Sequence, residues 1–487
     1  MRRFSLPLSL ALLSLLCACG EDRTTSATDG ATGDATGDST GDATGDATAD
    51  VPDALQGSLL VDPDAEIIEE PTRAQLQYVP GEGAPPPSHV EFYIDDELLS
   101  VAEQPPFTAE WLINRGANNG ERVARAVAYD ADVTRETLER TVTQALPEPG
   151  ANEWTFVGPS IYDGTFGPWD IVAMPDNRVA LAGKRGGRRV QFVLDQAGAL
   201  AWNNYWQDGE ENCVAFDGQD LLYVGEHPDL GEVAHVSTEG EQLELLHVPD
   251  VNGNWKTLYG CATHEGALYL AGNYQHYMYL YAGTTPLATF DVGDDFCCSL
   301  EYGLALDAHG RITVAGGGRL SMGSQSRRFV AQFDLDGQPR WQDIATPPGS
   351  DSIVFRGLSV GPEDDIYVIY GPHAVIREPQ TLTLYRYSSD GELLWKYDTN
   401  SEMFEDVAVD ERGTVYLAAI ARVSENRDSF RIYALGPDDE LQWMREHKAP
   451  MGADISSMHI ALGANGELWV AGELWSGGDM WVGRFGI

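Results

Sequence analysis

The chain has 487 residues and a formal net charge of −45, from 76 acidic against 31 basic side chains. A chain of this length usually holds two to four domains. So large an acidic excess repels nucleic acid and anionic membrane surfaces, which argues against both as partners and agrees with a soluble exported protein.

The N-terminus carries export signals. Residues 1–18 begin with two Arg, continue with an apolar run and end in small residues, as secretory signal peptides do. The stretch LCACG (16–20) resembles the lipobox of bacterial lipoproteins, which implies cleavage before Cys19 and lipidation of that residue. Gly20 is not the Asp that retains enteric lipoproteins at the inner membrane. We therefore expect an exported protein at the outer membrane or cell surface, attached to the membrane through its lipid alone; the alternative is an ordinary signal peptide.

Residues 19–54 are expected to be a disordered acidic tether. The segment GDATGDSTGDATGDAT (33–48) repeats a short unit without large apolar residues. Such a segment cannot offset its ordering entropy, and its like charges extend it. The Asp spacing matches neither an EF-hand loop nor the glycine-aspartate nonapeptide repeat, so it predicts no calcium site.

Residues 55–148 read as short strands of a β-sandwich. Apolar and polar residues alternate in HVEFYIDDELLSVAEQPPFTAEW (89–111) and in ERVARAVAYDADV (121–133), with turn signals about every ten residues. The elements VEFYIDDELL, PPFTAEW and ARAVAYD resemble a bacterial immunoglobulin-like domain, although the antibody-type Cys pair is missing. The resemblance implies a spacer or an adhesive module.

Residues 150–487 contain an internal repeat. Each copy is a short apolar strand, a polar turn and a second apolar strand that ends in a small residue, and most copies continue with two further strands. The seven copies are DIVAMPDNRVALAG (170), CVAFDGQDLLYVG (213), GCATHEGALYLAG (260), GLALDAHGRITVAG (303), GLSVGPEDDIYVIY (357), DVAVDERGTVYLAA (406) and HIALGANGELWVAG (459). Four strands per copy predict an all-β, seven-bladed β-propeller.

The seventh copy has a third strand, MWVGRF, but no fourth. A spare strand, NEWTFVG (152–158), precedes the first copy, and its Trp154 is placed like Trp202, Trp341, Trp395 and Trp443 in other copies. We expect residues 152–158 to be the fourth strand of the last blade. This pairing would join the two ends of the repeat array in one sheet and leave only short outer edges.

The repeats resemble secreted bacterial propellers built of SBBP-type or delta-60-type repeats. The DG-E-x-x-W ends also resemble blades of quinoprotein-like propellers. The resemblance implies a fold rather than a function, because propellers host many functions. Quinoprotein dehydrogenases of this kind carry a vicinal disulfide over their cofactor, but they have more blades and a calcium-ligand set that is not matched here.

Candidate binding residues lie in the connections between blades, which share one face around the axis. Aromatic and Arg residues are good anchors for a partner. The residues chosen on this basis are Trp169, Asn212, Trp255, Tyr259, Tyr302 and Arg356. The alternative is that they only cap the blades.

The scarce basic residues are clustered. Lys184, Arg185, Arg188 and Arg189 fall in the predicted second-to-third-strand loop of the first blade, and Arg319, Arg327 and Arg328 in that of the fourth. A basic rim containing Arg185, Arg188 and Arg319 could select an anionic ligand such as an acidic glycan. The alternative reading is a set of solvated loop residues.

The mature chain keeps four Cys besides Cys19. They are Cys213, Cys261, Cys297 and Cys298, and an exported protein should pair them, with three connectivities open. Cys213 and Cys261 begin inner strands of adjacent blades one residue out of phase, so they could meet, leaving a vicinal pair at 297–298. Two ordinary bridges between blades remain the alternative.

No triad, carboxylate pair or metal-binding spacing stands out, so the sequence assigns no catalytic and no metal-ligating residues. No cofactor is expected; calcium or a quinone is the alternative that the quinoprotein resemblance implies. The sequence favours a monomeric binding module for a protein or glycan on the cell surface, with no nucleic-acid partner. The alternatives are a propeller-type hydrolase or lyase, a quinoprotein oxidoreductase, and a structural envelope component.

Overall fold

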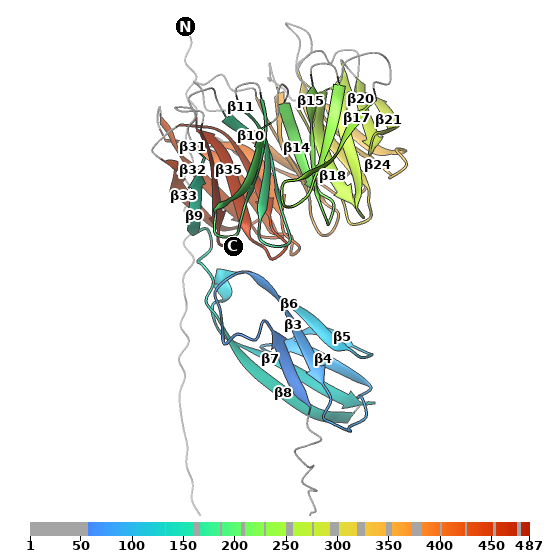
Figure 1. Ribbon diagram of the computed structural model, residues 1–487, viewed down its shortest axis with the longest axis vertical. Coiled ribbons are helices and arrows are strands. Elements are labelled where there is room, and N and C mark those ends of the chain that lie inside the picture. Colours follow the sequence, from blue (N-terminus) through green and yellow to red (C-terminus); the bar gives the residue numbers. More distant parts are fainter. Residues whose placement is uncertain are drawn as a thin grey trace, which may run out of the picture. The chain divides into compact units, whose positions relative to one another are not determined.

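The computed structural model describes residues 57–487 with short gaps. The gaps are residues 132, 159–165, 186–187, 206–209, 228–229, 250–256, 275–276, 293–300, 319–326, 347–352, 373–381, 400–401, 424–425, 451–453 and 475–478. Apart from one 3-10 turn, η2 (Gly116–Asn118), the elements of this part are strands (Figure 1). No helix in it is long and apolar enough to cross a membrane. The protein is all-β, as predicted.

The first described region consists of two sheets that share one apolar core. One sheet has the order β1 (Ser58–Asp62), β3 (Thr72–Val79), β6 (Phe107–Ile113). The other has the order β2 (Ile67–Ile68), β8 (Val133–Gln144), β7 (Gly120–Asp130), β4 (His89–Ile94), β5 (Glu97–Ala102). Burial alternates along β4, where Val90, Phe92 and Ile94 point into the core. Alternation with period two therefore placed these strands correctly.

Seven four-stranded sheets follow in the described part of the chain, and we number them along the sequence. The first three are β10 (Phe166–Ala173), β11 (Val179–Arg185), β12 (Arg188–Leu194), β13 (Leu200–Tyr205); β14 (Glu210–Phe216), β15 (Leu221–His227), β16 (Leu230–Val236), β17 (Gln242–Val248); and β18 (Thr257–His264), β19 (Ala267–Tyr274), β20 (Tyr277–Ala282), β21 (Thr285–Asp291). The fourth and fifth are β22 (Glu301–Leu306), β23 (Ile312–Gly318), β24 (Arg327–Phe333), β25 (Pro339–Ala345); and β26 (Ile353–Val360), β27 (Ile366–Pro372), β28 (Leu382–Tyr387), β29 (Leu393–Thr399). The last two are β30 (Glu402–Val409), β31 (Val415–Val423), β32 (Asn426–Leu435), β33 (Leu441–Lys448); and β34 (Ile455–Leu462), β35 (Leu468–Leu474), β36 (Asp479–Phe485), β9 (Asn152–Val157).

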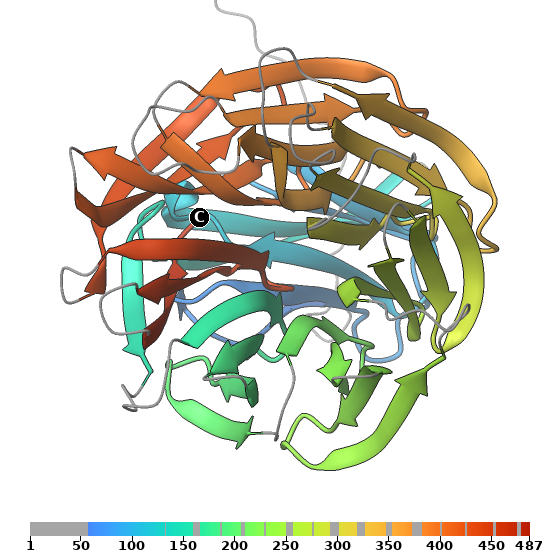
Figure 2. The same ribbon diagram turned by 90° about the horizontal axis from the view of Figure 1, so that it is seen from above.

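The first strands of these sheets form a closed ring. Each of them contacts the first strand of the next sheet, and β34 of the seventh sheet contacts β10 of the first. Figure 2 shows the sheets arranged like spokes around a common axis. Apolar residues fill the spaces between neighbouring sheets, and β23, which is buried along its whole length, is typical of the second strands. This architecture is a β-propeller.

The seventh sheet combines the two ends of the repeat region. Strand β9 pairs antiparallel with β36, from Asn152 opposite Phe485 to Val157 opposite Trp481. The strand predicted at 152–158 therefore lies in the last sheet. This arrangement hydrogen-bonds residues far apart in sequence and closes the ring through a sheet rather than a loop.

An outer Trp ties each of several sheets to the next one. The indole N–H of Trp154 donates to the carbonyl of Gln196 at 3.0 Å, that of Trp202 to Thr238 at 2.9 Å, and that of Trp341 to Ser389 at 3.1 Å. Each ring covers a turn glycine of the next sheet, and these glycines are Gly198, Gly240 and Gly391. All three have positive φ, which favours glycine, and a Cβ there would collide with the indole. Trp154 thus makes the same kind of contact as Trp202 and Trp341, whose place in the repeat it shares.

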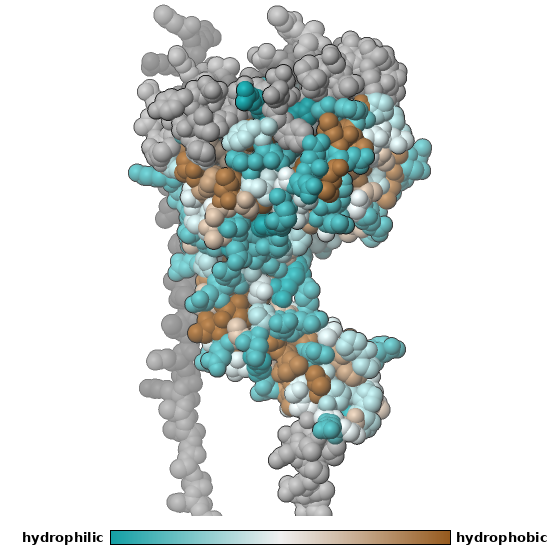
Figure 3. All heavy atoms as spheres, viewed as in Figure 1, coloured by the Kyte–Doolittle hydropathy of each residue, from teal (hydrophilic) through white to brown (hydrophobic). Residues whose placement is uncertain are grey.

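The surface is mostly polar. On the face shown in Figure 3, hydrophilic residues surround small, separate apolar patches. Several exposed apolar residues belong to outer strands: Leu200, Leu243, Leu393, Leu394, Tyr397, Leu441 and Met444. Scattered residues of this kind are normal on soluble proteins and mark no site by themselves.

Candidate functional site

A cavity of about 580 Å³ lies at the axis of the ring. The first strand of every one of the seven sheets contributes to its wall, and β35 adds Glu473. Its volume falls within the roughly 300–1,000 Å³ that small-ligand sites occupy. Because all seven sheets meet here, the axial cavity is the place where side chains from distant parts of the sequence converge.

A repeated irregularity of the first strands brings one residue per strand to this cavity. In five of the seven, the pairing with the second strand shifts by one residue at the same place. The bulged residues are Trp169, Asn212, Tyr259, Arg356 and Glu405, and all five line the cavity. A β-bulge redirects the side chain of the extra residue, so the backbone positions this ring.

Four of the predicted binding residues belong to that ring: Trp169, Asn212, Tyr259 and Arg356. Trp169 is 38% exposed, and the amide of Asn212 donates to the carbonyl of Leu258 at 2.8 Å. Tyr302 lies on β22 opposite Gly316, at the position equivalent to the bulges; only its backbone is described.

The other predicted binding residues are not placed in the cavity wall. Trp255 and Arg319 lie outside the described residues, and only the backbone of Arg185 is described, at the end of β11. Arg188 is exposed at the start of β12 and does not line the cavity.

The predicted basic rim is wrong for two of its residues. Arg189 is 3% exposed and pairs with Glu232 of the second sheet at 2.8 Å. Arg328 is 6% exposed, pairs with Asp343 at 2.9 Å and has its guanidinium 4.3 Å from the ring centre of Tyr385. Both stand on third strands rather than in loops, and both already pair with a carboxylate, Arg189 with one of the next sheet and Arg328 with one of its own sheet. They are therefore not available to select an anionic ligand.

The ion pair of Arg356 and Glu405 crosses between the fifth and sixth sheets within the wall. The Arg356 Nη1 lies 3.0 Å from the Glu405 Oε2, and the Glu405 side chain is only 3% exposed. Truncating one member of such a pair would leave an uncompensated charge in a poorly solvated place. Sequence reasoning missed Glu405, although the aligned repeats place it in the same column as Trp169, just before Asp406.

Two carboxyl groups lie one residue after the bulges. Asp170 accepts the N–H of Ile171 at 2.8 Å and, from the second sheet, the N–H of Val214 at 3.0 Å. Burial raises the pKa of Asp170 to about 7, although these hydrogen bonds oppose the shift. Neither Asp170 nor the second of these residues, Asp406, was among the residues predicted from the sequence.

Asp406 repeats this arrangement. It accepts the N–H of Val407 at 2.8 Å and, from the seventh sheet, the N–H of Ile460 at 3.0 Å. Burial raises the pKa of Asp406 too, and the neighbouring Asp170 and Glu405 add to the rise. The two Asp residues therefore serve first as ties between sheets.

A disulfide joins Cys213 and Cys261 in the cavity wall. Their pairing between adjacent sheets is one of the connectivities left open by the sequence, and it is confirmed. Cys297 and Cys298 lie outside the described residues, so the vicinal pair, and with it the quinoprotein alternative, stays a prediction. Asp170 and the two sulfurs lie within 4.8 Å of one another, but sulfurs bonded to each other are not thiolate metal ligands.

Comparison with known proteins gives no family. No protein-family model matches the chain, and no curated protein matches it. Solved structures with a similar fold include Drosophila plexin A, in a complex with semaphorin 1b, at TM-score 0.45 and 11% identity over 70% of this chain and 88% of that one.

Two bacterial structures are similar in the same way. A Lactobacillus plantarum protein has TM-score 0.44 and 12% identity over 75% of this chain and 97% of its own. A gluconolactonase from Xanthomonas campestris has TM-score 0.36 and 14% identity over 69% and 99%. These structures include a gluconolactonase and a protein held in a complex with a partner, so they do not separate binding from catalysis.

Proposed function

We propose that this chain is an exported, lipid-anchored surface protein whose propeller binds a ligand in its axial cavity. The observation that carries the proposal is the ring of bulged residues: one irregularity, repeated in five sheets, turns Trp169, Asn212, Tyr259, Arg356 and Glu405 toward a single cavity. Aromatic and Arg residues are the usual anchors of binding sites. A ring built only for stability has no need of an exposed Trp at its axis.

The proposal includes a particular presentation of this site. A seven-bladed propeller (150–487) would be carried by an immunoglobulin-like spacer (55–148) and an acidic tether (19–54), with Cys19 lipidated. The LCACG stretch, the low-complexity tether and the two sheets with a common core support this order. A tether of this length lets the binding site reach away from the membrane.

Binding is favoured over catalysis by the state of the carboxyl groups. Each described carboxyl group of the wall is already engaged: Asp170 and Asp406 by backbone N–H groups, Glu405 by Arg356, and Glu473 by the hydroxyl of Ser456 at 2.6 Å. A general acid or base must instead exchange a proton with the substrate. These groups hold the wall in shape.

One observation favours an enzyme as the second candidate. The pKa of Asp170, raised by burial to about 7, lies where a general acid or base works best, and this residue lines the cavity. The second candidate is a hydrolase or lyase that uses Asp170.

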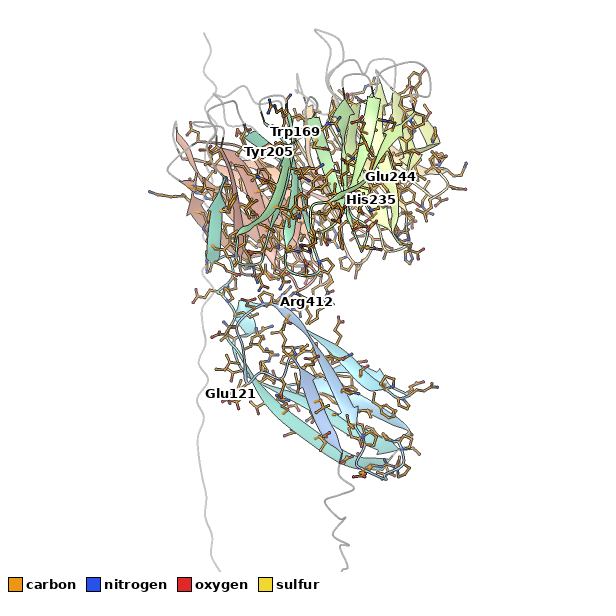
Figure 4. The ribbon with its side chains drawn as sticks, in the orientation of Figure 1. Glu121, Trp169, Tyr205, His235, Glu244 and Arg412 are labelled. Carbon is orange, nitrogen blue, oxygen red and sulfur yellow. A yellow bond between two sulfur atoms is a disulfide. The ribbon has the colours of Figure 1, made fainter. Side chains whose placement is uncertain are left out.

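The test compares two exposed aromatic residues of the first sheet, both labelled in Figure 4. Trp169 lines the cavity, whereas Tyr205, 41% exposed, ends the outer strand β13. The full chain, exported into an oxidising compartment, is screened by saturation-transfer NMR against neutral disaccharides, sugar acids and organic ammonium ions. We expect at least one class to bind the wild type and Tyr205→Ala equally, and Trp169→Ala about tenfold more weakly.

Two results would reject this proposal. If no probe binds, or if all binding survives Trp169→Ala, the axial cavity is not a binding site, and a structural envelope component becomes the better reading. If a probe is converted to product by the wild type but not by Asp170→Asn, the protein is an enzyme, and the second candidate function replaces the first.

A further inference from the structure

We infer that the ligand of the axial cavity is an uncharged saccharide. This inference rests on the proposed function, because it assigns a ligand class to the same cavity. It is carried by the side chains that the described wall offers: one exposed indole face beside an amide and a compensated ion pair.

An anionic ligand finds no unpaired Lys or Arg among the described residues of this wall, and the Nδ1 of His459 lies 3.9 Å from a carboxylate oxygen of Asp406. Among the described lining residues, Arg356 is the one Lys or Arg, and its guanidinium already binds the carboxylate of Glu405 at 3.0 Å. Arg189 and Arg328 do not line the cavity, and they pair with the carboxylates of Glu232 and Asp343. The acidic excess of the chain as a whole also repels anions.

A cationic ligand finds little uncompensated negative charge. The charge of Glu405 is balanced by Arg356, and the oxygens of Asp170 and Asp406 each accept a backbone N–H. Burial favours the protonated form of Asp170, Asp406 and Glu473, whose pKa values are all raised. A carboxyl group that keeps its proton attracts a cation weakly but can donate and accept hydrogen bonds.

The remaining features fit a sugar ring. A pyranose has one face of C–H groups and a rim of hydroxyls that both donate and accept. Trp169, 38% exposed on β10, offers a flat apolar face with a size that suits such a ring. The amide of Asn212, the planar pair of Arg356 and Glu405, and the hydroxyl of Ser457 supply hydrogen-bonding groups from four further sheets.

The size of the site agrees with this class. About 580 Å³ accommodates a small oligosaccharide or the end of a longer glycan, in the middle of the range for small-ligand sites. Hydrogen-bonding groups that come from four sheets would read the positions of several hydroxyls at once. Backbone pairing and the contacts between sheets already hold the wall in place. Ligand binding therefore costs little additional conformational entropy of the protein.

The test measures three probe classes by titration calorimetry on the full chain. The neutral probes are maltose, cellobiose and lactose; the anionic ones are glucuronic and galacturonic acid; the cationic ones are glucosamine and choline. We expect only neutral sugars to bind, with Trp169→Ala weakening them about tenfold, Trp169→Phe by less than about threefold, and Tyr205→Ala not at all. Trp169→Phe keeps an aromatic face and guards against misfolding of the Ala variant.

The outcomes separate the inference from the proposed function. Binding of sugar acids or ammonium ions alone, with the same dependence on Trp169, would overturn the saccharide inference and leave the axial binding site standing. Binding that is indifferent to Trp169, or no binding by any class, would overturn both.

Discussion

The first and second sheets, and the second and third sheets, are tied together at equivalent positions of their inner strands, but by different chemistry. In the first, Asp170 accepts the N–H of Val214 at 3.0 Å. In the second, Cys213 forms a disulfide with Cys261. In both ties, one partner is the first residue of its repeat copy, and the other is the second residue of the next copy.

The other joints show what this point requires. The sixth sheet repeats the carboxylate, with Asp406 accepting the N–H of Ile460. The third, fourth and fifth sheets have Gly260, Gly303 and Gly357, where an added Cβ would come within 2.9, 2.4 and 2.5 Å of atoms of the next sheet. At these six joints the inner strands approach so closely that the position holds either a side chain that bonds to the next strand or none at all; the seventh copy has His459 there.

Among changes at these joints, removal of the disulfide should lower the free energy of unfolding the most. The bond closes a loop of 48 residues, which in the chain-entropy account stabilises the fold by about 4 kcal/mol. We expect Cys213→Ala with Cys261→Ala to lower the free energy of unfolding by that amount in urea titrations followed by tryptophan fluorescence. Val214→Ala is the matched control, at about 1.5 kcal/mol. A loss no larger than the control's would mean that the disulfide adds nothing beyond packing.

The joints also show how much of the fold was accessible from the sequence. Aligning the seven copies put Asp170, Cys213, Gly260, Asp406 and their equivalents in one column, and the ring places that column at the joints. The lone Trp154 predicted the closing strand, because an indole that caps the next turn recurs in the other sheets. Repetition made these features visible, since each copy reports the same environment.

The site was less accessible, for two physical reasons. A β-bulge adds one residue to a strand, so the period-two pattern cannot tell that Glu405 turns toward the axis; Trp169 was chosen for its residue type and its place between blades. The charged run containing Arg189 looked like a solvated loop, because its partner, Glu232, stands in another sheet. Partners across a sheet boundary have no fixed spacing in the sequence.

The contact between the first and second sheets should stabilise the fold to an extent that depends on pH, whereas the disulfide between the second and third sheets should not. Glu211 is 1% exposed, near Arg189 and Glu232, and accepts a hydrogen bond from Gln191. Burial raises its pKa from the ordinary 4.5 to about 7. The folded state therefore holds a proton that the unfolded state releases between these values, so stability falls as pH rises from about 4.5 to 7.

The variant Glu211→Gln isolates this contribution. The full pKa difference corresponds to roughly 3 kcal/mol, present below pH 4.5 and lost above pH 7. We expect the loss of unfolding free energy between pH 4.5 and pH 8 to be smaller in Glu211→Gln than in the wild type by up to that amount. Equal pH dependence in the two proteins would show that Glu211 ionises freely in the folded state.

Truncation of a carboxylate tie should cost less than removal of the disulfide. Asp406→Ala leaves the N–H groups of Val407 and Ile460 without their acceptor, but it also removes a poorly solvated carboxyl group. We expect a net loss of about 2 kcal/mol. The control Asp390→Ala, at an exposed turn, should change stability by less than about 0.5 kcal/mol. If the two variants are alike, the carboxylate is not a tie and the analogy with the disulfide fails.

The smallest effect is expected at a glycine joint. In Gly260→Ala the new Cβ would lie 2.9 Å from the backbone N of Leu304 in the fourth sheet, so one of the two inner strands must move. Overpacking of this kind usually costs about 1–2 kcal/mol, and because Gly260 lies in the axial wall, it should weaken ligand binding as well. In Gly158→Ala, the control, the nearest atom is 3.5 Å away and no loss is expected. If both variants keep their stability and their ligand binding, the inner strands at the glycine joints can accommodate a methyl group. Close approach would then be required only where a carboxylate or a disulfide bridges the sheets.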